Sequence, residues 1–527
     1  MRTTPSNLLT DLPLPQPRKG RKNPSPWREP WGQGPRGTRS PGGAIRDALS
    51  GLAVVLFHKT NPNTAGSVAP PGLMRLSNSL PMAHAMGFRS FGPPGLPRVS
   101  YRNEGRPLHA SRPGPWTSSA KCIAWMLALL LPAMAFGADL GIVVDAGPHD
   151  RESTPIHFTA PAALSTHQSW ELRATDGTTR PIQWFHGEAW FLESDLRAGT
   201  SRSYRIEPAN NPSANQTNAL ASAWVGKNLE LRFSGNPVLQ YLAHAGQRPR
   251  NNIEPIYERG GYLHPVRTPS GRVVTDDYPA NHIHHHGIWS AWTKTRFDGR
   301  TPDFWNMGQG KGRVDFSRFD GLHIGPVLAG FEARQVQIDT GVSPPVRVLE
   351  DSWCTAVYPV RLSKGPPLHV FDVQSEQRLL TEKPLELPKY YYGGLGFRGP
   401  WNWNGEANMA YLDSNGVTNR VTANGTRARW YWVGGTVDGA LAGIAVLGHP
   451  ANFRAPEPLR VHPKEPFVCW APSHLGDWAL EPGKAHVARY RFVVFDGAPD
   501  AGMLNRLWAD FAEPPVVRVE PGTALKR

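Results

Sequence analysis

Residues 281–305, NHIHHHGIWSAWTKTRFDGRTPDFW, concentrate side chains that can do chemistry. They include four histidines, three tryptophans and two aspartates, namely His282, His284, His285, His286, Trp289, Trp292, Trp305, Asp298 and Asp303. Imidazole exchanges protons near neutral pH and ligates metals, and indole faces stack on flat apolar surfaces such as sugar rings. The segment therefore predicts a functional site and leaves its chemistry undecided.

The spacing of these histidines predicts how they are presented. If residues 281–289 are extended, His282, His284 and His286 share one face of a strand, each about 6.6 Å from the next. Three ligands on one straight strand rarely converge on one ion with bonds near 2 Å. We therefore expect two of the histidines to combine with groups from other strands, and at least one of His284 and His285 to line a cleft. The alternative is that they cap turns or bond to backbone carbonyls.

Asp303 and Trp305 follow a turn-like Asp-Gly pair and share a face if this piece is a strand. A carboxylate beside an indole is a common arrangement for holding a sugar, since the hydroxyls bond to one group and the ring stacks on the other. In the alternative interpretation Trp305 is a core residue and Asp303 caps the turn.

Residues 390–398, YYYGGLGFR, read as a strand that ends in three glycines and Arg398. Glycines allow a ligand to approach the backbone closely, and Arg398 can fix a hydroxyl or carboxylate with paired donors. No Lys-Ser/Thr follows and no helix opens, so a nucleotide site is not expected. The alternative is a β-bulge with Arg398 in a surface ion pair.

Two loops after apolar strands, GHPAN at 448–452 and WAPSH at 470–474, offer His449, Asn452 and His474 as further contributors. In the alternative interpretation, these three residues only stabilise the conformation of their loops and bind nothing. Glu376 lies on an alternating strand whose polar face is either a groove or, as is more frequent, exposed to solvent.

The positive charge of the chain, +14 overall, lies at its N-terminus. The first 120 residues hold 16 of the 57 Lys and Arg residues but 4 of the 43 acidic ones, with 19 Pro and 14 Gly. This composition predicts a disordered leader over 1–120, or a true start downstream at Met82 or Met86. Residues 121–137 have the basic, apolar and small-residue pattern of a signal peptide, which predicts a periplasmic or secreted protein. Because the remainder is near neutral, nucleic-acid binding is not expected.

Beyond the signal, short alternating segments such as SRSYRIEP at 201–208 predict an all-β fold, a large antiparallel β-sandwich. We expect a small β-domain at 138–206, a linker at 207–222, the main sandwich at 223–512 and a disordered tail at 513–527. One amphipathic helix is expected, at Ala501–Phe511. The chain beyond the signal contains no run of 18 or more apolar residues, so no integral membrane span is expected. Cys354 and Cys469 either form one disulfide or stay free.

The chain resembles a bacterial family of unknown function that carries the label methane oxygenase PmoA, over roughly residues 225–510. The resemblance rests on NHIHHHGIW at 281–289 with DFW at 303–305, on YGGLGFR at 392–398, and on GIAV at 443–446 through HPAN at 449–452. The family pattern runs Asp-His-Pro-His-His-Arg-Gly-Leu-Trp, and Asn281, Ile283 and His286 stand in place of its Asp, Pro and Arg. The label names a subunit of membrane-spanning helices. The β-rich character is more similar to galactose mutarotase-like sandwiches, which implies a sugar-binding groove.

These observations predict an exported β-sandwich enzyme that acts on a carbohydrate by acid–base chemistry. The expected catalytic residues are His284, His285, Asp303 and Glu376, and the expected substrate-binding residues are Trp305, Arg398, His449, Asn452 and His474. We expect these residues to converge in one groove, within about 10 Å of a common point. Epimerase, lyase and hydrolase reactions are all compatible with this set. No cofactor is assigned, and the expected partner is a small-molecule or oligosaccharide substrate.

Two other functions fit the same residues. The first is a copper or zinc enzyme that uses His282, His284 and His285 as ligands. The second is a glycan-binding module without catalytic activity.

Overall fold

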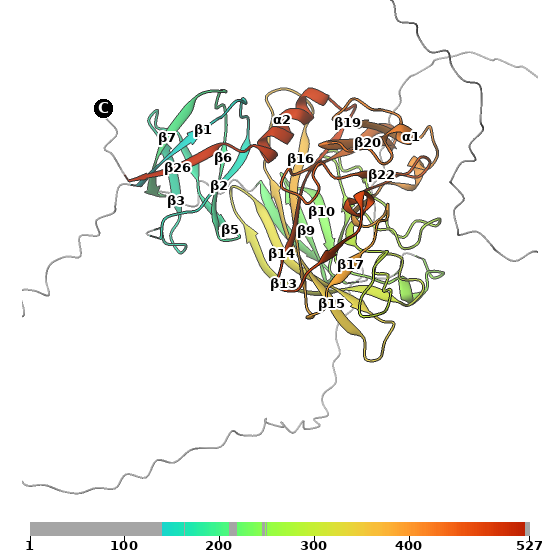
Figure 1. Ribbon diagram of the computed structural model, residues 1–527. Coiled ribbons are helices and arrows are strands. Elements are labelled where there is room, and N and C mark those ends of the chain that lie inside the picture. Colours follow the sequence, from blue (N-terminus) through green and yellow to red (C-terminus); the bar gives the residue numbers. More distant parts are fainter. Residues whose placement is uncertain (1–139, 163, 210–218, 245–247, 249, 522–527) are drawn as a thin grey trace, which may run out of the picture. The chain divides into compact units, whose positions relative to one another are not determined.

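The computed structural model of the protein describes residues 140–521, apart from 163, 210–218, 245–247 and 249. The predicted leader and signal peptide lie outside the described residues, as does the greater part of the predicted linker. Strands dominate the described part, and all of their pairings are antiparallel (Figure 1). The predicted all-β class is therefore confirmed. Neither α-helix of the described part is long and apolar enough to cross a membrane.

Eight strands form a first sheet. In spatial order they are β22 (Leu459–Val461), β23 (Phe467–Trp470), β18 (Gly394–Arg398), β12 (Ile288–Ala291), β11 (Tyr262–Val266), β10 (Asn236–Leu242), β9 (Asn228–Phe233) and β8 (Leu220–Val225). The neighbours β12, β18 and β23 come from three segments that are far apart in the sequence. Because these three strands are neighbours, side chains from all three segments can meet where the strands end.

A second sheet also has eight strands. In spatial order they are β13 (Gly312–Ile324), β14 (Ala329–Asp339), β15 (Val346–Tyr358), β16 (Leu368–Leu379), β25 (His486–Asp496), β21 (Ala440–Gly448), β20 (Trp430–Val437) and β19 (Ala410–Asp413). The long strands β13 to β16 form a meander (Figure 1).

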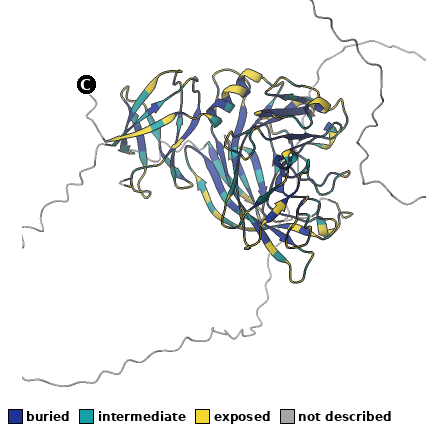
Figure 2. Cartoon of the chain, viewed as in Figure 1, coloured by how far each residue is buried: buried dark blue, intermediate teal, exposed yellow. Residues whose placement is uncertain are grey.

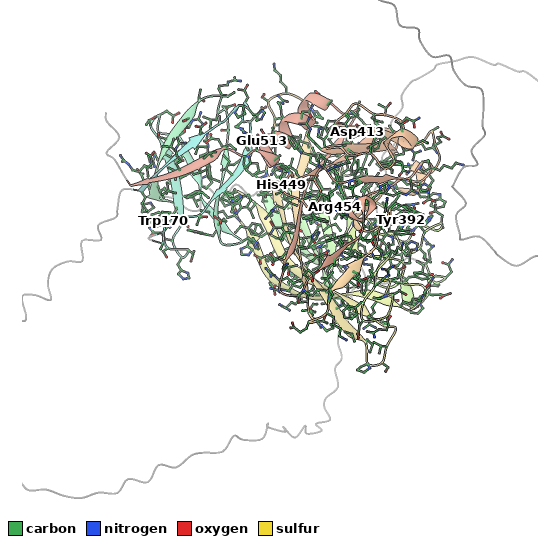
Figure 3. The ribbon with its side chains drawn as sticks, in the orientation of Figure 1. Trp170, Tyr392, Asp413, His449, Arg454 and Glu513 are labelled. Carbon is green, nitrogen blue, oxygen red and sulfur yellow. The ribbon has the colours of Figure 1, made fainter. Side chains whose placement is uncertain are left out.

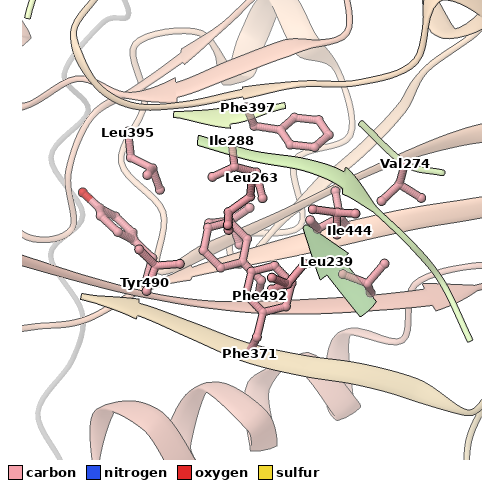
Figure 4. Packing of buried hydrophobic residues seen from close by; sticks show 14 of the residues in the cluster. Leu239, Leu263, Val274, Ile288, Phe371, Leu395, Phe397, Ile444, Tyr490 and Phe492 are labelled. Carbon is pink, nitrogen blue, oxygen red and sulfur yellow. The ribbon is translucent and has the colours of Figure 1, made fainter. Parts of the chain in front are cut away.

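The main hydrophobic core lies between these two sheets. Leu239, Leu263 and Ile288 of the first sheet pack into one cluster with Phe371 and Phe492 of the second (Figure 4). Every second residue of a strand faces this core, and each side chain of this size contributes about 1.5–3 kcal/mol when fully buried. Buried residues line the inside of both sheets, while exposed ones lie in loops and on edge strands such as β13 (Figure 2). The predicted sandwich is therefore present.

The N-terminal strands form two smaller sheets over a core of their own, which includes Ile142, Leu172 and Phe191. One has the order β26 (Val516–Pro521), β1 (Leu140–Asp145), β7 (Ser201–Pro208), β3 (Trp170–Ala174) and β4 (Thr179–Pro181); the other has the order β2 (Thr154–Phe158), β6 (Glu188–Glu193) and β5 (Gln183–Phe185).

Strand β26 corrects the prediction of a disordered tail from residue 513. It pairs with β1 in register from Leu140↔Pro521 to Asp145↔Val516. The free edge of β1 supplies these backbone partners, and the sequence does not show that such an edge exists. The predicted linker is likewise shorter than expected at both ends, since β7 extends to Pro208 and β8 begins at Leu220.

The predicted helix is confirmed as α2 (Ala501–Ala512). Asp500 caps its first turn, because its Oδ1 accepts hydrogen bonds from the backbone N–H groups of Gly502 and Met503 at 2.7 and 3.1 Å. Leu504 and Leu507 are buried on one side of the helix.

The remaining elements are short. They are α1 (Arg420–Ala423), the two-stranded pair β17 (Leu385–Leu387) and β24 (Trp478–Leu480), and the 3-10 turns η1 (Pro255–Tyr257), η2 (Trp401–Trp403) and η3 (Pro472–Leu475). Cys354 on β15 and Cys469 on β23 are free thiols.

Candidate functional site

The histidines of residues 282–286 lie in a turn, and the strand predicted for them begins only at Ile288. The backbone N–H of His285 donates to the carbonyl of His282 at 2.8 Å. Such a turn places residues i and i+3 next to each other. The rings of His282 and His285 are accordingly stacked, with centroids 4.8 Å apart. The predicted grouping of His282, His284 and His286 on one face is therefore wrong.

The strand order of the first sheet brings two distant charged residues to this turn. Arg398, the last residue of β18, donates its backbone N–H to the carbonyl of Gly287 at 2.8 Å and pairs in register with Phe467 of β23. Its fully buried guanidinium donates from Nη1 to Glu465 Oε2 at 2.9 Å and from Nη2 to Asn281 Oδ1 at 3.0 Å. Glu465 lies just before β23.

An imidazole and a carboxylate meet at the surface end of this arrangement. His282 Nδ1 lies 2.9 Å from Glu465 Oε2, and the two side chains are 35% and 16% exposed. We call His282, His284, His285, Arg398 and Glu465 the histidine–glutamate cluster. Solvent reaches the cluster through the partly exposed side chains of His282 and Glu465.

Electrostatics keep the groups of this cluster in definite protonation states. Burial, aided by the positive charges of His282, His286 and Arg398, lowers the pKa of His284 to about 3. Burial lowers the pKa of His285 well below its usual range. Burial acts to raise the pKa of Glu465, but the contact with His282 and the charges of His462 and Arg398 outweigh it and lower this pKa to about 2. At neutral pH, Glu465 is a carboxylate and both His284 and His285 are neutral.

Aromatic residues connect the cluster to a half-exposed group of three tyrosines. Phe467 stacks on His285 with centroids 4.8 Å apart, and Tyr392 packs against Phe467 at 5.7 Å. The rings of Tyr390 and Tyr391, and of Tyr391 and Tyr392, are each 4.7 Å apart. We call Tyr390, Tyr391 and Tyr392 the tyrosine cluster.

The glycines after the tyrosine cluster have a structural role, because the backbone there needs positive φ angles and close packing. Gly393 and Gly394 have φ of +112° and +91°, and a Cβ on Gly394 would lie 2.5 Å from the carbonyl oxygen of Trp470. They turn the chain into β18 (Gly394–Arg398); the strand predicted over 390–398 ends at Arg398 as expected but begins only at Gly394. Their role here is close packing against β23.

Asp303 and Trp305 adopt the alternative roles considered for them. Asp303 Oδ1 accepts the backbone N–H groups of Trp305 and Asn306 at 3.0 and 2.9 Å, so it caps the turn. Trp305 is 2% exposed and packs against Trp289, with its edge toward His285. A sugar ring cannot stack on an indole that is buried in this way.

The structure does not bring the other four predicted residues to the cluster. Glu376 pairs with Arg378 on an exposed strand face, His449 packs against Phe511, and Asn452 bonds to Glu457 and to the backbone of Arg489. His474 is half-buried in η3. Within the described residues, none of the four forms a hydrogen bond, ion pair or ring contact with the cluster. Figure 3 shows His449 well apart from Tyr392, which marks the tyrosine cluster.

The sequence interpretation missed Glu465 and did not assign the tyrosines to the site. His462 and Glu465 carry a local signal, since the backbone N–H of Glu465 donates to His462 Nδ1 at 2.9 Å across a tight turn. In the sequence, this signal is an imidazole and a carboxylate three residues apart just before a strand, as at His462 and Glu465. Of the described side chains, His282, His285 and Glu465 are placed closely enough to hold a metal ion together.

Residues 228–509, which include the whole histidine–glutamate cluster, match a family described as Family of unknown function (DUF6807). This chain belongs to that family. The comparisons give no support to the methane oxygenase label. None of the curated proteins matches the chain.

Solved structures show distant similarity. An alpha-mannosidase from Enterococcus faecalis V583 has a TM-score of 0.32 and 11% identity, over 72% of this chain and 46% of the mannosidase. A protein in the Glycosyl Hydrolase Family 38 from Enterococcus faecalis has a TM-score of 0.32 and 9% identity, over 73% of this chain and 48% of that protein. The DUF6807 chain thus spans about half the length of each.

Proposed function

We propose that this DUF6807 protein is an enzyme that carries out acid–base chemistry on a carbohydrate at the histidine–glutamate cluster. The proposal is carried by the 2.9 Å contact between His282 Nδ1 and Glu465 Oε2, in a pair that is partly exposed. An imidazole and a carboxylate side by side can accept and return protons at substrate hydroxyl or ring carbon positions. Glu465 takes the role that the sequence assigned to Asp303 or Glu376.

The surroundings of the pair supply the other functions that a sugar site needs. His284 is neutral at physiological pH because burial lowers its pKa to about 3, so its imidazole can accept a hydrogen bond from a substrate hydroxyl. The tyrosine cluster offers flat faces for a sugar ring and hydroxyls for its oxygens. It takes the stacking role predicted for Trp305. Arg398 is buried and acts on Glu465 as a positioning residue.

The test is an activity screen of the purified protein on a panel of oligosaccharides, with products identified by mass spectrometry and NMR. Epimerisation leaves the mass unchanged, elimination gives an unsaturated product, and hydrolysis adds water. We expect Glu465→Gln and His282→Ala to lower kcat by about 10²–10⁴-fold, the usual contribution of general acid–base catalysis.

The chain offers a matched control away from the cluster. His149 and Glu513 form another imidazole–carboxylate pair, with Nε2 2.8 Å from Oε2 and both side chains exposed. His149→Ala and Glu513→Gln should leave turnover unchanged. If sugars bind but no turnover occurs, the protein is a glycan-binding module and the catalytic proposal fails. Equal turnover in Glu465→Gln and the parent protein also overturns it.

We further propose that the protein is exported. The support is the signal-like pattern of residues 121–137, with Lys121, a short apolar core and small residues before residue 138. N-terminal sequencing of the protein recovered from fractionated cells tests this proposal. A mature N-terminus near residue 138 in the periplasmic or secreted fraction supports it, and an uncleaved cytoplasmic chain contradicts it.

A further inference from the structure

We infer that the histidine–glutamate cluster is a binding site for a divalent transition metal ion, Zn²⁺ by the nature of its donors, held by His282, His285 and Glu465. This inference concerns metal binding and does not depend on the proposed action on carbohydrates; with an ion bound, His282 and Glu465 would be its ligands, so the proton transfer proposed for them belongs to the metal-free protein. It also differs from the ligand set predicted from the sequence, in which His284 took the place of Glu465.

The spacing of the donors fits a shared ion. Among the described residues, these three form the one group of His, Cys, Asp or Glu side chains whose ligand atoms all lie within 4.8 Å of one another. Donors around a tetrahedral zinc ion lie roughly 3.4 Å apart, with bonds of about 2.1 Å. Shifts on the order of an ångström in the side chains would therefore close the site around an ion.

The ring separations agree with this geometry, although the two rings are stacked with planes 19° apart, so one ring must rotate for both lone pairs to point at the ion. Two imidazoles bound to one zinc ion, through bonds of about 2.0–2.1 Å, have centroids roughly 5 Å apart. The centroids of His282 and His285 are 4.8 Å apart, and those of His282 and His284 are 5.7 Å apart. The 282–285 turn fixes the closer pair through its backbone, so the polypeptide already holds both rings before any ion arrives.

The buried imidazole of His285 is otherwise unexplained. Its side chain is 4% exposed, and no described group forms a hydrogen bond with its Nδ1. A buried polar atom without a partner costs about 1–3 kcal/mol, which a hydrophobic side chain at this position would avoid. A metal ion bound by the ring explains why an imidazole is retained there.

Arg398 orients the carboxylate of Glu465 in the proposed metal site. It holds Glu465 Oε2 at 2.9 Å and is itself fixed by Asn281 and Asn404. Outer groups of this kind orient the ligands of a metal site. Two histidines and one carboxylate leave a fourth position for water or substrate, as in catalytic zinc sites rather than structural ones. His284 lies beside this set, with its ring centroid 4.8 Å from that of His285, and stays free.

The experiment measures metal binding directly. The purified protein is stripped with a chelator, and Zn²⁺ and Mg²⁺ are titrated in separately by calorimetry, followed by metal analysis after dialysis. We expect one Zn²⁺ per chain with a Kd of about 1 μM or tighter. No binding of Mg²⁺ is expected, because this ion prefers oxygen ligands in octahedral geometry. Co²⁺ should give the visible absorption bands of a four-coordinate ion.

Three variants identify the ligands. Glu465→Gln, His282→Ala and His285→Ala should each weaken Zn²⁺ binding at least about 100-fold, since each removes one of three protein ligands. His284→Ala should stay within about 10-fold of the parent protein, and His149→Ala should match it. Because His285 is buried, the partly exposed residues His282 and Glu465 carry the test if His285→Ala does not fold.

Two results overturn the inference: absence of Zn²⁺ binding, or binding that Glu465→Gln and His282→Ala leave unchanged. A larger loss in His284→Ala than in Glu465→Gln overturns the ligand set. None of these measurements uses sugar turnover. If the protein binds Zn²⁺ but does not act on carbohydrates, the metal site is supported and the proposed function fails. If it acts on carbohydrates but does not bind Zn²⁺, the proposed function is supported and the metal site fails.

Discussion

Arg398 contacts Glu465 from a fully buried position, with Nη1 2.9 Å from Oε2. Burial lowers the pKa of Arg398, whereas the negative charge of Glu465 acts to raise it. A buried guanidinium needs such a partner, because removing charge from water costs several kcal/mol. The arginine in turn sets the direction of the carboxylate on which both proposals depend. Although Arg398 was predicted to bind substrate, its burial leaves it to position another residue.

Replacing Arg398 with methionine should destabilise the fold by about 3 kcal/mol, because Glu465 is left without its charged partner. Urea denaturation measures the difference. Arg378→Met is the control, since it removes an exposed pair with Glu376 and should cost less than about 1 kcal/mol. Equal losses in the two variants would show that the Arg398–Glu465 pair adds nothing beyond a surface contact.

Gly287 lies between the histidine turn and β12, with no room for a side chain. A Cβ there would lie 2.2 Å from the carbonyl oxygen of Leu263, a backbone atom that cannot move away cheaply. Gly287→Ala should destabilise the protein by about 1–3 kcal/mol and also weaken Zn²⁺ binding, because the turn must shift. Thermal unfolding and calorimetry check both effects. Gly341→Ala, at an exposed position where the Cβ would lie 3.2 Å from a side-chain oxygen of Asp339, should cost less stability than Gly287→Ala.

Local patterns sufficed to predict much of the fold. The alternation of SRSYRIEP matches β7 (Ser201–Pro208), and the 3.6-residue periodicity of 501–511 matches α2. Each pattern reflects the face that its own element buries. Strand β26 escaped prediction because it forms only along the free edge of β1, more than 300 residues earlier in the chain.

The site shows the same division between local and distant contacts. The histidines were found from their composition, but their arrangement was wrong because a turn, set by the His285 N–H to His282 carbonyl bond, replaces the expected strand. Glu465 was missed because it reaches the histidines only through the neighbouring positions of β12, β18 and β23. Strand order of this kind is a property of the whole sheet, and no segment of sequence contains it.

Glu457 should make stability depend on pH. Burial raises its pKa from 4.5 to about 7, although hydrogen bonds from Asn452 and Tyr490 act to lower it. The folded state therefore binds the proton more tightly than the unfolded state. Protonated Glu457 therefore contributes about 3 kcal/mol to the free energy of unfolding. This contribution is fully present below about pH 4.5 and is lost as the pH rises to about 7. In Glu457→Gln this contribution should be absent. Denaturant unfolding from pH 4.5 to 8.5 compares the two proteins, and parallel profiles would contradict the prediction.

Tyr391, the middle ring of the tyrosine cluster, should contribute to binding of the sugar rather than to its reaction. It is half-buried, with both neighbouring rings 4.7 Å away and the guanidinium of Arg460 over its face at 5.4 Å. Tyr391→Ala should raise KM about 3–10-fold through lost stacking, with kcat unchanged, because the ring touches substrate equally before and during the reaction. Tyr391→Phe keeps the ring and should stay near the parent KM. Trp224→Ala removes an aromatic that is 55% exposed on β8 and serves as the control. Steady-state kinetics on the substrate found in the oligosaccharide screen decide the matter: an unchanged KM in Tyr391→Ala would place the sugar elsewhere, and a fall in kcat would show that Tyr391 acts in the reaction itself.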